Sequence, residues 1–127
     1  MEEFLKIIKE LSEVLTELIA YSEIKVDAAQ SNKVSMVDDC LKKEQALVMK
    51  FRGFEQKREK LMEDLGFSGK SFQEILSIID EAKREEAIVA FEGLSQKVQM
   101  LQILQAELDV LMKLNIRELE QAINQKK

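Results

Sequence analysis

The feature that most constrains this chain is the complete absence of proline from its 127 residues. Proline interrupts helices because its ring fixes φ and removes a backbone N–H donor. The apolar residues recur at spacings of three and four, which is the period of an α-helix. The chain therefore favours long, unbroken helices, and we expect an all-α protein that forms one domain over residues 1–127.

The first half of the chain predicts two long helices. One spans about residues 2–29 and ends at a polar turn over residues 30–33. Its apolar stripe includes two polar positions and reads Phe4, Ile8, Leu11, Leu15, Leu18, Ser22, Lys25 and Ala29, with Ile7, Val14, Tyr21 and Ala28 beside it. The other helix spans residues 34–65 and ends at Gly66, because glycine adopts the left-handed cap conformation at little cost.

The stripe of this second helix is less regular than that of the first. It consists of Val34, Val37, Leu41, Glu44, Val48, Phe51, Glu55, Arg58, Met62 and Leu65. Cys40 lies beside it and is interpreted as a buried packing residue.

The second half of the chain predicts one short helix and one very long helix. Ser71, followed three residues later by Glu74, forms a capping-box pattern for a short apolar helix that ends near residue 80. The last helix spans about residues 81–125, and its length is about 65 Å, against about 42 and 48 Å for the first two.

These elements predict an elongated antiparallel three-helix bundle with one short extra helix. Long helices joined by short connections fold back on one another. A mean apolar period of 3.5 residues is typical of coiled-coil-like packing. Part of the last helix would then extend beyond its neighbours.

The residue types argue against catalysis and metal binding. The chain has no histidine and a single cysteine, so the usual zinc sites and His-containing di-iron sites have no ligands. Gly69, Lys70 and Ser71 imitate the end of a phosphate-binding loop, but the glycine that this motif requires five residues earlier is Asp64. We expect no enzyme activity and no cofactor.

Charge and cysteine content indicate the kind of compartment and partner. The formal net charge of −5 disfavours nucleic acid as a partner, because phosphate binding requires a basic surface. The single cysteine is compatible with a reducing compartment. No signal peptide or membrane-spanning segment is evident, so we expect a cytoplasmic protein with no membrane insertion.

The last helix is apolar on more than one face. Beside its main stripe lie Met100, Ile103, Leu104, Val110, Leu111, Leu114 and Ile116. This excess has two interpretations. The helix is buried at the centre of a bundle or in a homodimer, or it presents a surface that accepts an amphipathic helix from a partner protein.

The order of these elements resembles the FlgN family of flagellar export chaperones. The resemblance rests on the polar turn at Gln30, Ser31 and Asn32, the Leu65–Gly66 helix end, and the short capped segment 71–79. It also includes the charged run Phe54-Glu-Gln-Lys-Arg-Glu-Lys-Leu61 and the final segment Leu114-Asn-Ile-Arg-Glu-Leu-Glu-Gln-Ala-Ile123.

This resemblance implies a non-enzymatic chaperone for the hook–filament junction proteins, which are also called hook-associated proteins. Members of the family bind C-terminal helical segments of these proteins, prevent premature assembly and deliver them to the type III export gate. The cargo site lies toward the last helix, so we expect partner contacts at Ile103, Leu104, Leu111, Leu114, Asn115 and Ile116, in a monomer or weak homodimer. The alternatives are a structural coiled-coil or dimerising adaptor protein, and a chaperone for the filament-cap protein.

Overall fold

The computed structural model describes the backbone of residues 1–125 and the side chains of residues 1–110. This part of the chain forms four helices and contains no strand: α1 (Glu2–Gln30), α2 (Val34–Leu65), α3 (Phe72–Ile78) and α4 (Glu81–Gln125). The all-helical prediction is confirmed, and the predicted boundaries differ from the observed ones by one or two residues at most.

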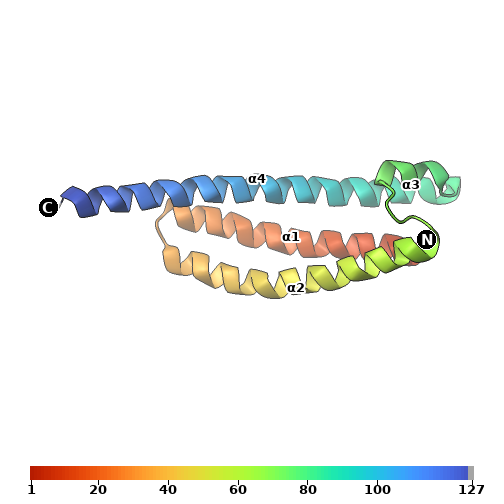
Figure 1. The fold of residues 1–127 in the computed structure, drawn as a ribbon, viewed down its shortest axis with the longest axis horizontal. Coiled ribbons are helices and arrows are strands. Elements are labelled where there is room, and N and C mark those ends of the chain that lie inside the picture. The colour runs from red at the N-terminus through yellow and green to blue at the C-terminus, as the bar shows by residue number, and fades with distance from the viewer. Residues whose placement is uncertain (126–127) are drawn as a thin grey trace.

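Helix α1 is the common neighbour of the other two long helices. It packs against both α2 and α4, whereas no Cα atoms of α2 and α4 approach within 8 Å in the described part of the chain. The three helices lie along one long axis, with α2 running opposite to α1 and α4 running in the same direction as α1 (Figure 1). Because α1 contacts two neighbours, its buried face has to be unusually wide.

The stripe predicted for α1 is buried throughout its length. Phe4, Ile8 and Leu11 are completely inaccessible, and the polar positions Ser22 and Lys25 are each only 2% exposed. The wide face also buries Leu5, Ile7, Val14, Val26 and Ala28. This helix therefore supplies most of the core.

The core is centred on the end of the molecule where α1 begins. The Phe4 ring makes edge-to-face contacts with Phe67, in the loop after α2, and with Phe91 of α4, at centroid distances of 6.2 and 6.1 Å. Phe72 of α3 stacks on Phe91 at 4.3 Å. Such pairs stabilise a core beyond the area that they bury. The cluster therefore holds α3 and the loop before it against the long helices.

The two ends of α3 are held by specific hydrogen bonds. The Ser71 hydroxyl accepts a bond from the Glu74 backbone N–H at 3.2 Å and lies 3.3 Å from the Glu74 carboxylate. The predicted cap is therefore present. At the other end, Arg84 of α4 donates to the Leu76 carbonyl oxygen at 3.2 Å, which satisfies an acceptor that a helix end leaves free.

Helix α2 ends as predicted, but its apolar stripe is only partly buried. Gly66 has φ 76°, the left-handed conformation of a C-terminal cap. Val37, Cys40, Glu44 and Met62 are buried. By contrast, Val34, Leu41, Val48 and Leu65 are between 37% and 58% exposed, so the expectation that they belong to a buried stripe is wrong. The reason is that α1 is the only helix whose backbone comes close to that of α2 in the described part of the chain. One neighbouring helix covers a narrower stripe of side chains than two neighbours would.

A buried ion pair joins α1 to α2 near the turn that connects them. Lys25 Nζ lies 2.9 Å from Glu44 Oε2, and the two side chains are only 3% and 11% exposed. The second carboxylate oxygen of Glu44 and the Ser22 hydroxyl, both buried, have no hydrogen-bond partner among the described residues. Separating the two charges would leave one of them buried and uncompensated, so the pair favours the contact between these faces of α1 and α2.

Candidate functional site

The alignment of α4 along α1 determines which side chains share a surface. Lys9 of α1 donates to Glu86 of α4 at 3.1 Å, a separation of 77 positions. The same separation relates Gln30 to Glu107, and these two residues line one hollow at the far end of α1. The two parallel helices thus keep one register over the whole length of α1.

Helix α4 carries an outward line of exposed apolar side chains beside α1. Val89 is 68% exposed, Met100 46%, Ile103 57% and Val110 58%. Val89, Gln96, Ile103 and Val110 repeat every seven residues, and Met100 occupies the intervening position of the same seam. We call these five residues the α4 seam. A heptad repeat of this kind is the pattern by which one helix packs against another.

Hollows between α1 and α4 occur at both ends of this seam. One, of about 790 Å³, includes Val89, Gly93 and Lys97 of α4 and Ser12 and Glu13 of α1. The other, of about 550 Å³, is lined by Gln30 together with Ile103, Ala106, Glu107 and Val110. The seam therefore connects two concave regions that share the same pair of helices.

The side of α1 that lies next to the α4 seam is polar and acidic. A row of exposed or half-buried residues at helical spacing runs along it: Lys9, Ser12, Glu13, Thr16, Ala20, Glu23, Asp27 and Gln30. The Lys9 amine, by its hydrogen bond and its charge, holds the pKa of the Glu86 carboxyl below its ordinary value. We call this row, the α4 seam and the α4 residues that line the two hollows the α1/α4 surface.

The residues predicted for partner binding fall into two groups. Ile103 lies on the exposed seam, whereas its neighbour Leu104 is only 9% exposed and belongs to the buried side of α4. The side chains of Leu111, Leu114, Asn115 and Ile116 lie outside the described residues. The backbone at these four positions belongs to α4 where it continues past the end of α1 (Figure 1).

Several residues of this surface were not expected from the sequence, among them Val89, Glu23 and Asp27. Val89 was not singled out because it precedes the region of apolar excess. Glu23 and Asp27 of the first helix were not singled out either. A sequence signal existed only for the seam, in the seven-residue spacing of Val89, Ile103 and Val110.

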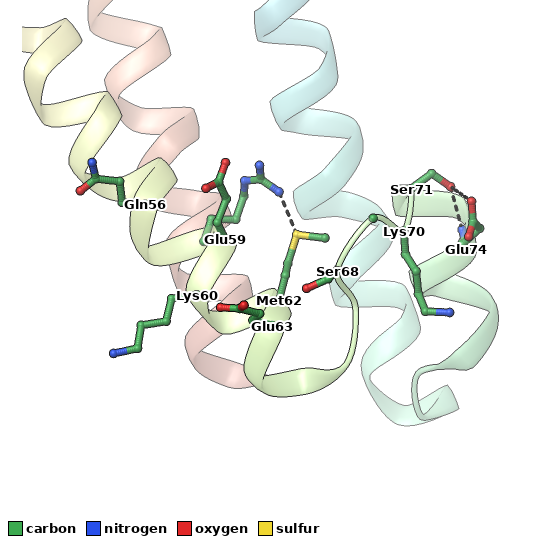
Figure 2. A pocket seen from close by; sticks show the side chains of 11 residues that line it. Gln56, Glu59, Lys60, Met62, Glu63, Ser68, Lys70, Ser71 and Glu74 are labelled. Carbon is green, nitrogen blue, oxygen red and sulfur yellow. Dashed lines mark hydrogen bonds between the residues drawn. The ribbon is translucent and has the colours of Figure 1, made fainter.

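A further hollow, of about 980 Å³, lies elsewhere, between the end of α2 and the loop before α3. Figure 2 shows Gln56, Glu59, Lys60 and Glu63 on the α2 side, and Lys70, Ser71 and Glu74 on the other side. Its remaining cation, Arg58, already contacts Glu55 at 2.8 Å and Met62 Sδ at 2.9 Å. The lining combines charged side chains of both signs, so it has no evident selectivity.

Within the part of the chain that the structure describes, no group of three or more metal-ligating side chains occurs. Nor is any described helix long and apolar enough to cross a membrane. Cys40 is buried, as expected for a packing residue.

Comparison of the chain with protein-family models, with curated proteins and with solved structures gives no match.

Proposed function

We propose that this protein binds an amphipathic helix of a partner protein along the α4 seam, and that it acts as a cytoplasmic flagellar export chaperone for hook–filament junction proteins. The observation that carries the first part is the exposure of Met100, Ile103 and Val110 along the α4 seam. Exposed apolar side chains that line up in this way are typical of interaction surfaces rather than of a solvated helix face.

The geometry of the seam favours a helix as the occupant. Heptad spacing presents side chains that another helix contacts in successive turns. The hollows at its two ends provide space beside Val89 and beside Val110 for the anchoring side chains of that helix. Met100, near the middle, has a flexible side chain that adapts to different partner residues.

The arrangement of the long helices supports the same proposal. We propose that α1, α2 and α4 form the elongated three-helix bundle expected from the sequence, with the partner as a fourth helix beside α1 and α4. Helix α4 continues beyond Glu107 for eighteen residues past the level of Gln30, or roughly 27 Å. This extension lengthens the surface that a partner helix could contact.

The flagellar part of the proposal rests on the sequence resemblance. The Leu65–Gly66 helix end, the capped segment 71–79 and the segment 114–123 support it. Of these features, the left-handed Gly66 and the Ser71 cap are present in the structure. Only a binding experiment distinguishes the alternative cargo, the filament-cap protein, from the junction proteins.

A homodimer is the second candidate, in the structural role of a coiled-coil adaptor. The extension of α4 past α1 favours it, because a helix without an intramolecular neighbour is marginally stable in water. In a dimer, the α4 extension of the second copy would pack against the α4 extension of the first. Sedimentation equilibrium separates the two roles, since an obligate dimer at low micromolar concentration supports the adaptor, and a monomer supports the chaperone.

Calorimetric titration tests the chaperone proposal. Synthetic C-terminal peptides of the two hook–filament junction proteins and of the filament-cap protein are titrated into the protein and into the variant Ile103→Asp. We expect the junction peptides to bind with a negative heat-capacity change, and the variant to lose this binding while it keeps its helical circular dichroism. Binding of the cap peptide alone would reassign the cargo, and binding of none would contradict the chaperone proposal.

A further inference from the structure

The α1/α4 surface has an uneven distribution of charge. Among the described carboxylates of this surface, only Glu86 has an ion-pair partner, since Lys9 and Lys83 both approach it. The other acidic side chains along the surface form no ion pair with any residue that the structure describes: Glu13, Glu23 and Asp27 on α1, and Glu85 and Glu107 on α4. Lys97 is the one cation of the surface that is not engaged by a carboxylate within the described residues.

The register of α1 and α4 places these acids beside the apolar seam. The separation of 77 positions found for Lys9 and Glu86 sets Glu23 level with Met100, and Asp27 level with Leu104, next to Ile103. Glu107 lies between Ile103 and Val110 in the hollow that Gln30 also lines. The apolar contact region is therefore bordered by negative charge at its centre and at its far end.

We infer that the helix that docks on the α1/α4 surface is basic: it has an apolar stripe that covers the α4 seam and lysine or arginine residues on the flank that faces α1. This inference deepens the proposed function and rests on it. Cations placed opposite Glu23 and Asp27 would gain attraction, whereas carboxylates there would be repelled. The charge of the rim thus selects among amphipathic helices that the apolar seam alone would accept equally.

The position of these charges also indicates how selectivity arises. All five unpaired acids are on exposed or half-exposed helix faces, so each interaction is weakened by solvent and by salt. Affinity then comes mainly from the apolar seam, and the acids act on the association rate and on the choice of partner. The preference for basic helices should accordingly shrink as ionic strength rises.

Two synthetic peptides provide a direct test. Both have about 21 residues, the length of the seam at the helical rise, and the same leucine heptads; their flanking positions are lysine in one and glutamate in the other. We expect the lysine peptide to bind the full chain at least about tenfold more tightly at low salt. We expect this ratio to fall several-fold between 0.05 and 0.5 M sodium chloride.

A matched pair of charge reversals locates the effect. The double variant Glu23→Lys and Asp27→Lys should reverse the preference toward the glutamate peptide. The control Glu59→Lys and Glu63→Lys makes the same change of net charge on α2, outside the surface, and should leave the preference intact.

The outcomes separate this inference from the proposed function. Equal binding of both peptides, or an equal effect of the two double variants, would overturn the charge selection while leaving helix docking in place. Failure of both peptides to bind, together with failure of the junction-protein peptides, would overturn the docking function itself.

Discussion

Lys25 of α1 and Glu44 of α2 form an ion pair at 2.9 Å inside the molecule, with side chains that are 3% and 11% exposed. No described cation other than Lys25 contacts Glu44, and one of its carboxylate oxygens has no partner. Among the described residues, Ser22 is the only other buried polar or charged side chain, so the pair lies in a largely apolar interior. Because an uncompensated buried charge is far more costly than a buried pair, the two residues should be strongly coupled.

Removing one member of this pair should destabilise the protein more than removing both. Glu44→Leu leaves the Lys25 ammonium buried without a partner and should lower the free energy of unfolding by about 3–5 kcal/mol. The double variant Lys25→Met and Glu44→Leu should recover most of that loss. Urea denaturation of the four proteins of the cycle measures the coupling, and additive effects of the two single substitutions would contradict it.

Gly53 within α2 and Gly66 at its C-terminal cap should respond to alanine substitution with opposite changes in stability. Gly66 has φ 76°, where an added Cβ is strained, so Gly66→Ala should cost about 1 kcal/mol or more. Gly53 lies within the helix with no atom within 4 Å of the position of a Cβ, so Gly53→Ala should stabilise by up to about 1 kcal/mol. Thermal unfolding measures the stability of both variants. Unfolding midpoints that shift in the same direction for Gly66→Ala and Gly53→Ala would be inconsistent with the assigned cap.

Adjacent positions on α4 should behave differently. Leu104 is 9% exposed, and Leu104→Ala should lower stability by about 2 kcal/mol or more, because burial is lost. Ile103 is 57% exposed, and Ile103→Lys should change stability by no more than about 0.5 kcal/mol. Denaturant titration of the two variants compares them. Equal losses would show that the seam is buried, which would remove the basis for docking.

The ion pair between Lys9 and Glu86 should be visible in a titration. The hydrogen bond and the charge of Lys9 lower the pKa of Glu86. The ion pair therefore contributes to stability above the ordinary glutamate pKa. That contribution is lost as the pH falls through the lowered pKa of the folded state. Lys9→Met should raise the pKa of Glu86 measured by carboxyl NMR, although Lys83, 3.9 Å away, should retain part of the depression. An unchanged pKa would contradict the pairing.

Much of the fold was predictable because the helical period is a local property. Even Ser22 and Lys25 fell on the predicted stripe of α1, and both are buried. Val34, Leu41 and Val48 were misjudged because burial on α2 depends on how many neighbours the helix has, which periodicity does not report. A position on the stripe thus favours burial but does not ensure it.

The candidate surface was predictable only in part, for a related reason. The excess of apolar residues on the last helix pointed to Ile103, but the separation of Ile103 from Leu104 requires the position of α1. The acidic flank depends on the register that brings Glu23 level with Met100, since these residues are far apart in the sequence. Pairwise arrangement of helices, and not the helices themselves, decides which residues share a surface.

Mapping the bound peptide by NMR tests the central claim, that the α1/α4 surface binds a basic amphipathic helix, most directly. The lysine-flanked peptide is added to uniformly ¹⁵N-labelled protein, and backbone amide shifts are followed to saturation. The account predicts the largest changes between Ser12 and Gln30 of α1 and between Val89 and Val110 of α4, with little change over Gln56–Glu63 of α2. Changes concentrated on α2 and the loop before α3, or no saturable change at all, would contradict it.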